Sequence, residues 1–537
     1  MNLNFLSDTI IPVVSRDKSR QLVSIPELLS GMGKSEFSEI SSVKTFQRPA
    51  VHQFFVHLAV VALDRAGKTS IEHSADEWKS MILDLAPLHA FDIYSDNPLQ
   101  AAFLQPPIDA KAYETARKAK EKHKLCADEL TVLIQTKNHS YKYSVSPNGS
   151  AWEWACSLIE VQTMSGYEGS GLYGSVRLNG AYGTRFLAGL YGDMDASSMW
   201  RRDVSVILKN LTKIREKYVF FSSSSAAKSL LWIEPWIADG QQMEFSDLHP
   251  MFVDVSRRLR LFVNDNGYQA LYTTSKTKRI NDLLGGQKED DRKGNVGDPW
   301  LPVRKNKDGY SAVTYKTLGL RNTAAIVLGT TSLDTVTKPL LMTASLDGEK
   351  NPFFYIAGLI GGQGKTAGFH EITLPTSSEY VSLEMSAAAY EKIAANADEM
   401  LKDVDVATKA LRLAIFVAAQ NGPDEINFDD KRAAGIGRAA QDQFNASIFH
   451  KFFDFAWKYG AVVDRKTGDV NFELVDEVTN QWRKYLTDMT RETWKRYASE
   501  ACGRNSSSYK AEVAGDRTLN INLASIKPEN TKGAVNE

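Results

Sequence analysis

The chain has 537 residues, enough for two large domains or about three of ordinary size. Its 64 Lys and Arg residues balance 65 Asp and Glu residues, and the formal net charge of −1 excludes a polycationic, histone-like protein. A nucleic-acid binder with a local basic face remains allowed, because electrostatic steering depends on where the charges lie. The three cysteines, Cys126, Cys156 and Cys502, are too far apart in sequence for a disulfide framework or a multi-cysteine zinc site, which favours a reducing cytoplasm.

The first eight residues have no basic segment and end in Asp8, so they do not resemble a signal peptide. The most apolar stretch, residues 54–63, spans ten residues, whereas a bilayer needs about 20. We therefore expect this stretch to be a buried helix of a soluble, cytoplasmic protein with no membrane partner.

The N-terminal part mixes strand-like and helical segments. Residues 9–14 are β-branched and interrupted by Pro12, and a second short strand is predicted over residues 22–25. Pro26 suits the first turn of a helix that continues to Leu29. Residues 50–66 predict a core helix and residues 111–123 a charged one, whereas residues 260–263 and 312–315 resemble strands.

A glycine-rich stretch at residues 165–192 cannot sustain a regular helix, because each interior glycine costs about 1 kcal/mol relative to alanine. It suits a loop whose backbone approaches something closely. Tyr167, Arg177, Asn179 and Arg185 lie among these glycines, and Asn and Arg side chains can reach base edges or phosphates in a nucleic-acid groove. A surface hairpin without a ligand explains the same residues, and residue types alone leave both interpretations open.

From about residue 377 onward, apolar residues recur at helical spacing in three successive stripes. The stripes are Val404, Ala407, Leu411, Ile415 and Ala418; then Phe444, Ile448, Phe452, Phe455 and Tyr459; then Leu474, Val478, Trp482, Tyr485 and Met489. Short connections between long amphipathic helices predict an antiparallel bundle. The fold class is therefore α+β: a large mixed domain over residues 1–375, then a four-helix bundle over residues 376–537 whose last twenty or so residues form a loose tail.

The run Gly361-Gly362-Gln363-Gly364-Lys365-Thr366 resembles the end of a phosphate-binding P-loop. The first glycine of that motif should stand at position 359, which is Leu359. A basic turn that contacts nucleic acid is the favoured interpretation. A nucleotide-binding enzyme that uses the loop at residues 358–368 is the alternative, and a helical scaffold protein is a third.

Other charged and titratable residues form no recognisable catalytic or metal motif. His52 and His57 are five residues apart, which misses the i,i+4 spacing of two ligands on one helix face, so we expect them to pack in a core. His249 precedes Pro250 and is predicted to lie in a turn. The basic clusters at residues 201–217, 257–260 and 276–279 are either a phosphate-binding face or an ordinary charge-balanced surface.

Several segments together resemble the large-subunit (CasA) family of the type I-E CRISPR surveillance complex, Cascade. They are Asn4-Phe5-Leu6-Ser7-Asp8-Thr9-Ile10-Ile11-Pro12-Val13, Val23-Ser24-Ile25-Pro26-Glu27-Leu28-Leu29, Trp232-Ile233-Glu234-Pro235-Trp236, Asp247-Leu248-His249-Pro250, Arg257-Arg258 and the glycine-rich residues 166–186. Ile10 stands where the family usually has tryptophan. The resemblance covers nearly the whole chain in the family's order.

The resemblance implies a non-catalytic subunit of an RNA-guided complex, with no cofactor and no metal. Members of the family recognise the protospacer-adjacent motif (PAM) on double-stranded DNA from the minor groove, and a wedge separates the strands so that guide RNA can pair with its target. The bundle helps to hold the displaced strand and the R-loop. The implied partners are guide RNA, other Cascade subunits, the target duplex with its displaced strand, and an effector helicase-nuclease.

The resemblance also implies which residues carry these roles. The glycine loop falls on Gly169, Ser170 and Gly171, and the lysine finger on Lys288 or Lys293. The wedge falls near residues 363–368. Ala367 aligns with the family's frequent glutamine at the tip, Gln363 lies four residues earlier, and Lys365, Thr366 and Gly368 complete the DNA contacts. Lys137, Asn138 and His139 are expected to touch the guide-RNA 5′ handle and the neighbouring subunit.

Overall fold

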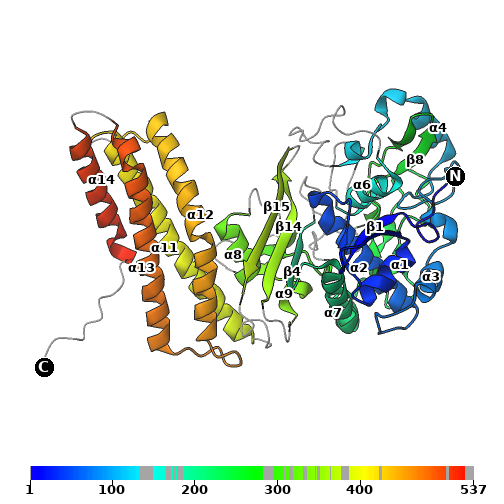
Figure 1. Ribbon diagram of the computed structural model, residues 1–537, viewed down its shortest axis with the longest axis horizontal. Helices are drawn as coiled ribbons and strands as arrows, with labels where there is room; N and C mark the ends of the chain where they lie inside the picture. Colours follow the sequence, from blue (N-terminus) through cyan, green and yellow to red (C-terminus); the bar gives the residue numbers. More distant parts are fainter. Residues whose placement is uncertain are drawn as a thin grey trace. The chain divides into compact units, whose positions relative to one another are not determined.

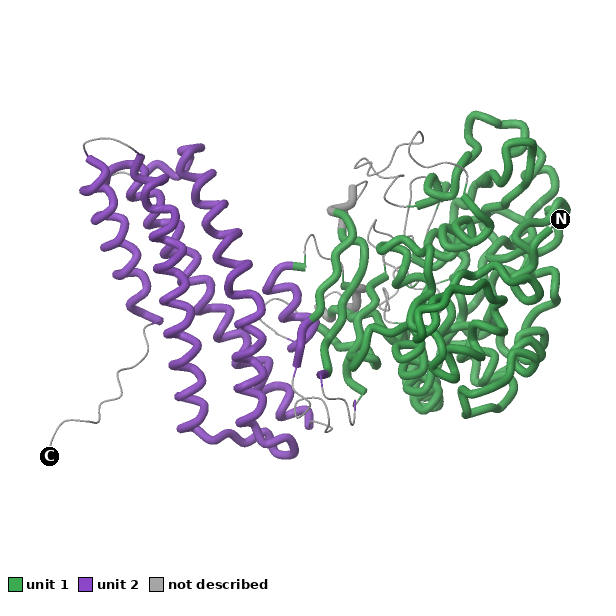
Figure 2. Tube along the Cα trace, viewed as in Figure 1, with its two compact units in different colours: residues 1–318, 336–344, 352–373 green, residues 319–335, 345–351, 374–537 purple. Residues whose placement is uncertain are grey.

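The computed structural model (Figure 1) describes most of the chain, in segments separated by short gaps. The described residues are 2–131, 149–164, 171–172, 177, 185–281, 296–306, 309–313, 318–329, 335–344, 346, 351–362, 365–376, 386–422, 426–503 and 507–526. The chain divides into two compact units (Figure 2). The first contains residues 1–318, 336–344 and 352–373, and the second contains residues 319–335, 345–351 and 374–537.

The first unit begins with a small antiparallel sheet in which β1 (Ile11–Ser15) lies between β2 (Arg20–Val23) and β3 (Phe37–Ile40). Helix α1 (Ile25–Gly33) follows β2 and extends four residues beyond the predicted end. Its start is fixed by a capping box, because Ser24 accepts a hydrogen bond from the Glu27 amide while the Glu27 carboxylate accepts one from the Ser24 amide.

Helix α2 (Arg48–Arg65) is the central element of this unit and confirms the predicted core helix. Most of its side chains are buried on every face, and it contacts α6 (Ala151–Thr163), α7 (Ala196–Lys217) and β7 (Leu248–Val253). A helix that is apolar all round belongs inside a domain rather than at its surface. His57 therefore packs in the core, as expected.

The remaining elements of the first unit complete a mixed α and β layer around α2. Its helices are α3 (Ala75–Leu83), α4 (Ala110–Lys118), α6 (Ala151–Thr163), α7 (Ala196–Lys217) and α9 (Leu340–Thr343). Its strands are β4 (Leu187–Tyr191), β5 (Lys228–Leu230), β6 (Met243–Glu244), β7 (Leu248–Val253), β8 (Leu259–Asn264), β9 (Gly267–Tyr272), β10 (Ile280–Asn281), β11 (Val303–Asn306), β12 (Gly309–Ala312), β14 (Phe353–Gly362) and β15 (Lys365–Pro375). Strand β13 (Thr335–Thr337) pairs with β11.

The arginines of two predicted basic clusters are structural rather than exposed. Arg257, Arg258, Arg260 and Arg279 are all buried. The Arg260 guanidinium alone donates to five backbone carbonyl oxygens, those of Ser95, Asn97, Gln100, Gln105 and Pro106. The interpretation of these residues as a phosphate-binding face is wrong, because the guanidinium groups satisfy buried loop carbonyls.

The second unit is a bundle of α11 (Ala387–Ala419), α12 (Lys431–Ala461), α13 (Phe472–Cys502) and α14 (Ser508–Asn522), with α8 (Leu320–Leu328) against it. Consecutive helices run in opposite directions (Figure 1), which confirms the antiparallel bundle. The first two predicted apolar stripes lie in its core, including Leu411 and Phe452. The third stripe is wrong except for Trp482, because Leu474 is exposed and the buried face of α13 includes Leu486 and Trp494 instead. The chain remains helical through Ile526, so the predicted tail is wrong for residues 518–526.

Candidate nucleic-acid interface

The described residues of the glycine-rich segment (residues 166–186) are each fixed to other parts of the first unit. Gly171 adopts φ = +84°, a conformation that favours glycine, and its carbonyl oxygen accepts a hydrogen bond of 2.7 Å from the Ser275 amide. Leu172 forms a parallel bridge with Ser275. Arg177 and Arg185 are buried at 0% and 2% exposure. The glycine-rich segment is therefore attached to the rest of the first unit at Gly171 and Leu172, at Arg177 and at Arg185.

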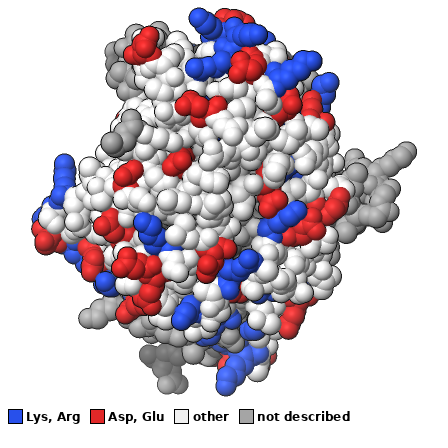
Figure 3. Space-filling view, turned by 90° about the vertical axis from the view of Figure 1, so that its right-hand side faces the viewer, with Lys and Arg blue, Asp and Glu red and all other residues white. Residues whose placement is uncertain are grey.

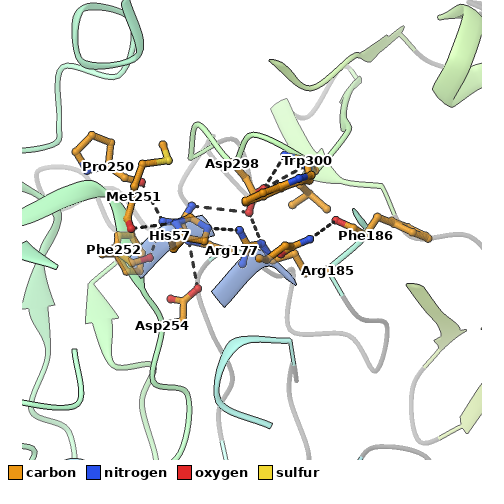
Figure 4. Close-up of polar contacts among 12 residues, drawn as sticks. His57, Arg177, Arg185, Phe186, Pro250, Met251, Phe252, Asp254, Asp298 and Trp300 are labelled. Atoms are coloured by element: carbon orange, nitrogen blue, oxygen red, sulfur yellow. Dashed lines mark hydrogen bonds and ion pairs between the residues drawn. The ribbon is translucent and has the colours of Figure 1, made fainter. Parts of the chain in front are cut away.

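Arg177 and Arg185 meet Asp254 and Asp298 in a buried group that includes His57, here called the arginine–aspartate cluster (Figure 4). Arg177 lies 3.2 Å from Asp254 and 3.8 Å from Asp298, and Arg185 pairs with the same oxygen of Asp298. Arg177 also donates to the carbonyl oxygens of Pro250 and Phe252 at the end of β7. Two arginines thus face two carboxylates, and the charges balance if His57 is neutral.

His57 is neutral in this environment. Burial, together with the nearby Arg185 and Arg177, holds the pKa of His57 well below its usual 6.5. Its Nε2 lies 2.8 Å from Arg185, and a guanidinium can only donate, so Nε2 accepts. The proton therefore resides on Nδ1, which donates to the Met251 carbonyl oxygen at 3.0 Å.

Asp298 itself lies in the segment that carries the predicted lysine finger, residues 288–301, here called the lysine-bearing segment, of which residues 296–301 are described. Its Oδ1 accepts hydrogen bonds from the amides of Trp300 (3.0 Å) and Leu301 (3.2 Å), while Oδ2 faces the two arginines. The Trp300 indole donates to Asp203 at 3.0 Å, and Asp203 also contacts His52 and the Tyr191 hydroxyl at the end of β4. One carboxylate therefore joins the glycine-rich and lysine-bearing segments.

These contacts correct two expectations from the sequence. Arg177 and Arg185 were candidates to reach base edges, but both side chains are buried against carboxylates and cannot touch DNA as they lie. His249 is in β7 rather than in a turn, and its Nε2 lies 3.0 Å from Asp64, which also pairs with Arg215. Asp298 was not among the predicted residues. It directly precedes the apolar run Pro299-Trp300-Leu301, and a carboxylate that is buried beside such a run requires a charged or hydrogen-bonding partner.

Strands β14 and β15 form a hairpin whose connection is the two residues Gln363 and Gly364. A P-loop requires a helix after its lysine, but here Lys365 and Thr366 begin a strand. The nucleotide-binding interpretation therefore lacks its structural context. Gly368 has φ = +102°, and a Cβ at this position would meet no neighbouring atom, so backbone conformation rather than crowding favours glycine there.

The pairing of β14 with β4 brings the hairpin and the glycine-rich segment to one end of a sheet. The two strands are antiparallel, with Ala357 opposite Leu187. Beyond that pair, β14 continues toward the hairpin tip, while the chain before Leu187 leads back to Arg185. Arg185 and Gly358 also line the same small cavity. The described parts of the hairpin, the glycine-rich segment and the lysine-bearing segment thus meet in the first unit, through Gly358, Arg185 and Asp298.

The predicted contact residues fall into two groups, inside and outside the described part of the chain. Gly171 and Gly368 have the positive φ angles given above, and Lys365, Thr366 and Ala367 occupy the first three positions of β15. The other predicted residues lie outside the described residues: Lys137, Asn138, His139, Gly169, Ser170, Lys288, Lys293 and Gln363.

Surface charge alone does not mark a nucleic-acid surface on the face shown in Figure 3. Lys and Arg side chains lie there among Asp and Glu side chains, around a broad area without either. In the described part of the chain, no helix is long and apolar enough to cross a bilayer, and no group of three or more His, Cys, Asp or Glu residues could hold a metal ion. The candidate interface therefore rests on the convergence of the three segments.

The model of the family "CRISPR-associated protein Cse1" matches residues 4–493 of this sequence. The chain belongs to the Cse1 family. This is the CasA-type large subunit of type I-E CRISPR systems, as the sequence motifs predicted. No curated protein matches the chain.

Solved structures of Cse1 proteins share the fold. Cse1 from Acidimicrobium ferrooxidans is 16% identical, with a TM-score of 0.63 and coverage of 98% of both chains. Cse1 from Thermobifida fusca is 13% identical, with a TM-score of 0.64 and coverage of 98% of this chain and 97% of that one. A chain of a "CRISPR RNA-guided surveillance complex" is 12% identical, with a TM-score of 0.52 and coverage of 94% and 100%. The architecture of the Cse1 family is thus retained at low sequence identity.

Proposed function

We propose that this chain is the PAM-reading subunit of an RNA-guided DNA surveillance complex. The observation that carries the proposal is the convergence of the glycine-rich segment, the lysine-bearing segment and the β14–β15 hairpin, held by Asp298 and by the β4–β14 register. Membership of the Cse1 family supports the same role. In such complexes the protein reads a short motif and the shape of the duplex, whereas base pairing reads the sequence.

The glycine-rich segment is the proposed minor-groove reader, through Gly169, Ser170 and Gly171. The minor groove is only about 6 Å wide, and backbone without bulky side chains can enter it. Lys288 or Lys293 is the proposed finger. Minor-groove edges distinguish A·T from G·C but little else, so the subunit should accept several PAM sequences.

The β14–β15 hairpin is the proposed wedge that starts strand separation without ATP hydrolysis. Gln363, Lys365, Thr366, Ala367 and Gly368 would contact the opened duplex. The support is the hairpin itself, whose strand β14 pairs with β4 directly after the described end of the glycine-rich segment. The role is binding rather than catalysis.

The other proposed contacts involve partners of the complex. Lys137, Asn138 and His139 would meet the guide-RNA 5′ handle and a neighbouring subunit. The helical bundle would hold the displaced strand and the R-loop, and the assembled subunit would recruit the helicase-nuclease in the cytoplasm. These assignments rest on the family resemblance.

The test is to reconstitute the complex with and without this chain and to measure its binding to matched duplexes that carry different PAM sequences. We expect PAM-dependent binding only when the chain is present. Gly171→Phe should weaken PAM-dependent binding about tenfold or more, a loss of about 1.4 kcal/mol.

Gly67→Phe is the matched control, because Gly67 also has a positive φ (+64°) and open space around it, but it follows α2. The control should bind as the unmodified complex does. Binding that ignores both the chain and the PAM would refute the proposal and favour the helical-scaffold alternative.

A further inference from the structure

The Asp298 side chain makes two kinds of contact at once. Its Oδ2 faces Arg177 and Arg185, which belong to the glycine-rich segment. Its Oδ1 accepts the amide hydrogens of Trp300 and Leu301, at the end of the lysine-bearing segment. The side chain has no exposed surface, so it cannot contact a ligand itself.

The surroundings of Asp298 make its charge necessary. Arg177 and Arg185 are both buried, and the carboxylates of Asp254 and Asp298 offset the hydration that these two guanidinium groups lose. Arg177 also pairs with Asp254, whereas Arg185 lies between Asp298 and the neutral His57 (Figure 4). An amide in place of the Asp298 carboxylate would keep the shape of the side chain but leave excess positive charge in the cluster.

The aromatic ring of Trp300 strengthens this connection. The Arg185 guanidinium lies 5.5 Å from the centre of the Trp300 ring, and the indole N–H donates to buried Asp203. Asp203 in turn accepts from the Tyr191 hydroxyl at the end of β4, the strand that pairs with the hairpin. The cluster is thus continuous with the root of the proposed wedge.

We propose that Asp298 is a positioning residue that fixes the glycine-rich and lysine-bearing segments to one point, so that they engage the PAM as a unit. This inference rests on the proposed function. It goes beyond that function by assigning specificity to a buried carboxylate that never touches DNA. His57 supports the arrangement as a neutral hydrogen-bond acceptor for Arg185.

The variant Asp298→Asn tests the proposal in the reconstituted complex. We expect at least a tenfold loss of affinity for a PAM-bearing duplex. Affinity for a target whose strands are already separated next to the PAM should change less than twofold, because such a target bypasses PAM reading and opening. A loss confined to the closed duplex distinguishes a positioning role from general destabilisation.

Asp64→Asn is the matched control. Asp64 is a half-buried carboxylate of the same unit that pairs with Arg215 and His249 and does not contact Arg177 or Arg185. It should lower thermal stability while keeping the preference for PAM-bearing duplexes. An equal loss of that preference in both variants would overturn the proposal, as would an unchanged preference in Asp298→Asn.

A second measurement needs no DNA and separates the inference from the proposed function. In the full chain, Asp298→Asn should speed hydrogen exchange at residues 185–191 and at residues 296–301 together, whereas Asp64→Asn should not. Exchange that rises at neither place, or at only one, refutes the shared attachment. Exchange could instead rise at residues 185–191 and 296–301 while the unmodified complex shows no PAM dependence. The shared attachment would then stand, but the proposed function and the role of Asp298 in PAM reading would both be refuted.

Discussion

The bundle and the first unit are held together in different ways. In the bundle, apolar side chains at helical spacing, such as Leu411, Phe452 and Trp482, are buried between long helices, and α11 contacts α12, α13 and α14. In the first unit, buried arginines from irregular segments bind carboxylates and carbonyl oxygens that are distant in sequence. The bundle depends on matching volumes, whereas the first unit adds matched buried charges and donors to an apolar core of its own.

The largest effect should come from removing a buried charge in the first unit. Arg260→Met keeps an unbranched side chain but removes the guanidinium donor from five carbonyl oxygens. Those of Asn97 and Gln105 also accept from backbone amides, so three lose their donor, and we expect the free energy of unfolding to fall by about 3–5 kcal/mol. The control in the bundle is Leu486→Met, an apolar exchange of similar volume at a fully buried position, which should cost less than about 1.5 kcal/mol. Denaturant unfolding measures the loss of free energy of unfolding in both variants. Equal losses would contradict the claim that the first unit depends on buried charges in a way that the bundle does not.

A smaller effect should come from volume alone within the bundle. A Cβ added at Gly515 on α14 would overlap the ring of Trp494 and lie 3.1 Å from the Ala414 carbonyl oxygen. Gly515→Ala should therefore destabilise the bundle by about 1–3 kcal/mol. Gly435 on α12 has open space around it, so Gly435→Ala should instead stabilise by about 0.5–1 kcal/mol through helix propensity. Calorimetry measures the change in stability of each variant, and a change of the same sign for Gly515→Ala and Gly435→Ala would contradict this prediction.

The smallest effect should appear in mild acid and should belong to the first unit. Burial lowers the pKa of both His57 and His249 in the folded chain. Below about pH 6.5 the unfolded chain binds protons that the folded chain does not, so stability falls as the pH decreases from 7 toward 5. His57→Gln should make this dependence on pH less steep. An unchanged slope in unfolding titrations would show that His57 does not contribute.

The sequence predicted the parts of the structure that depend on local patterns. The spacing of Phe452 and its neighbours was enough to place α12, and Pro26 indicated where α1 begins. The roles of Arg177 and Arg185 could not be predicted in this way. Their partner Asp298 lies 121 and 113 residues further along the chain, and only the folded chain brings them together. Glycine-rich composition indicated a loop but not where the loop is attached.

The stem of the β14–β15 hairpin also has a mechanical consequence. Leu359 and Ile360, three and two residues before the last residue of β14, are almost fully buried, and Leu359 packs with Phe46 and Phe369. Separating one base-pair step of DNA costs about 1.4 kcal/mol of stacking energy. In the proposed wedge, a stem that is buried as far as Ile360 would resist bending under such a load and would pass it through Phe46 and Phe369 to the core of the first unit.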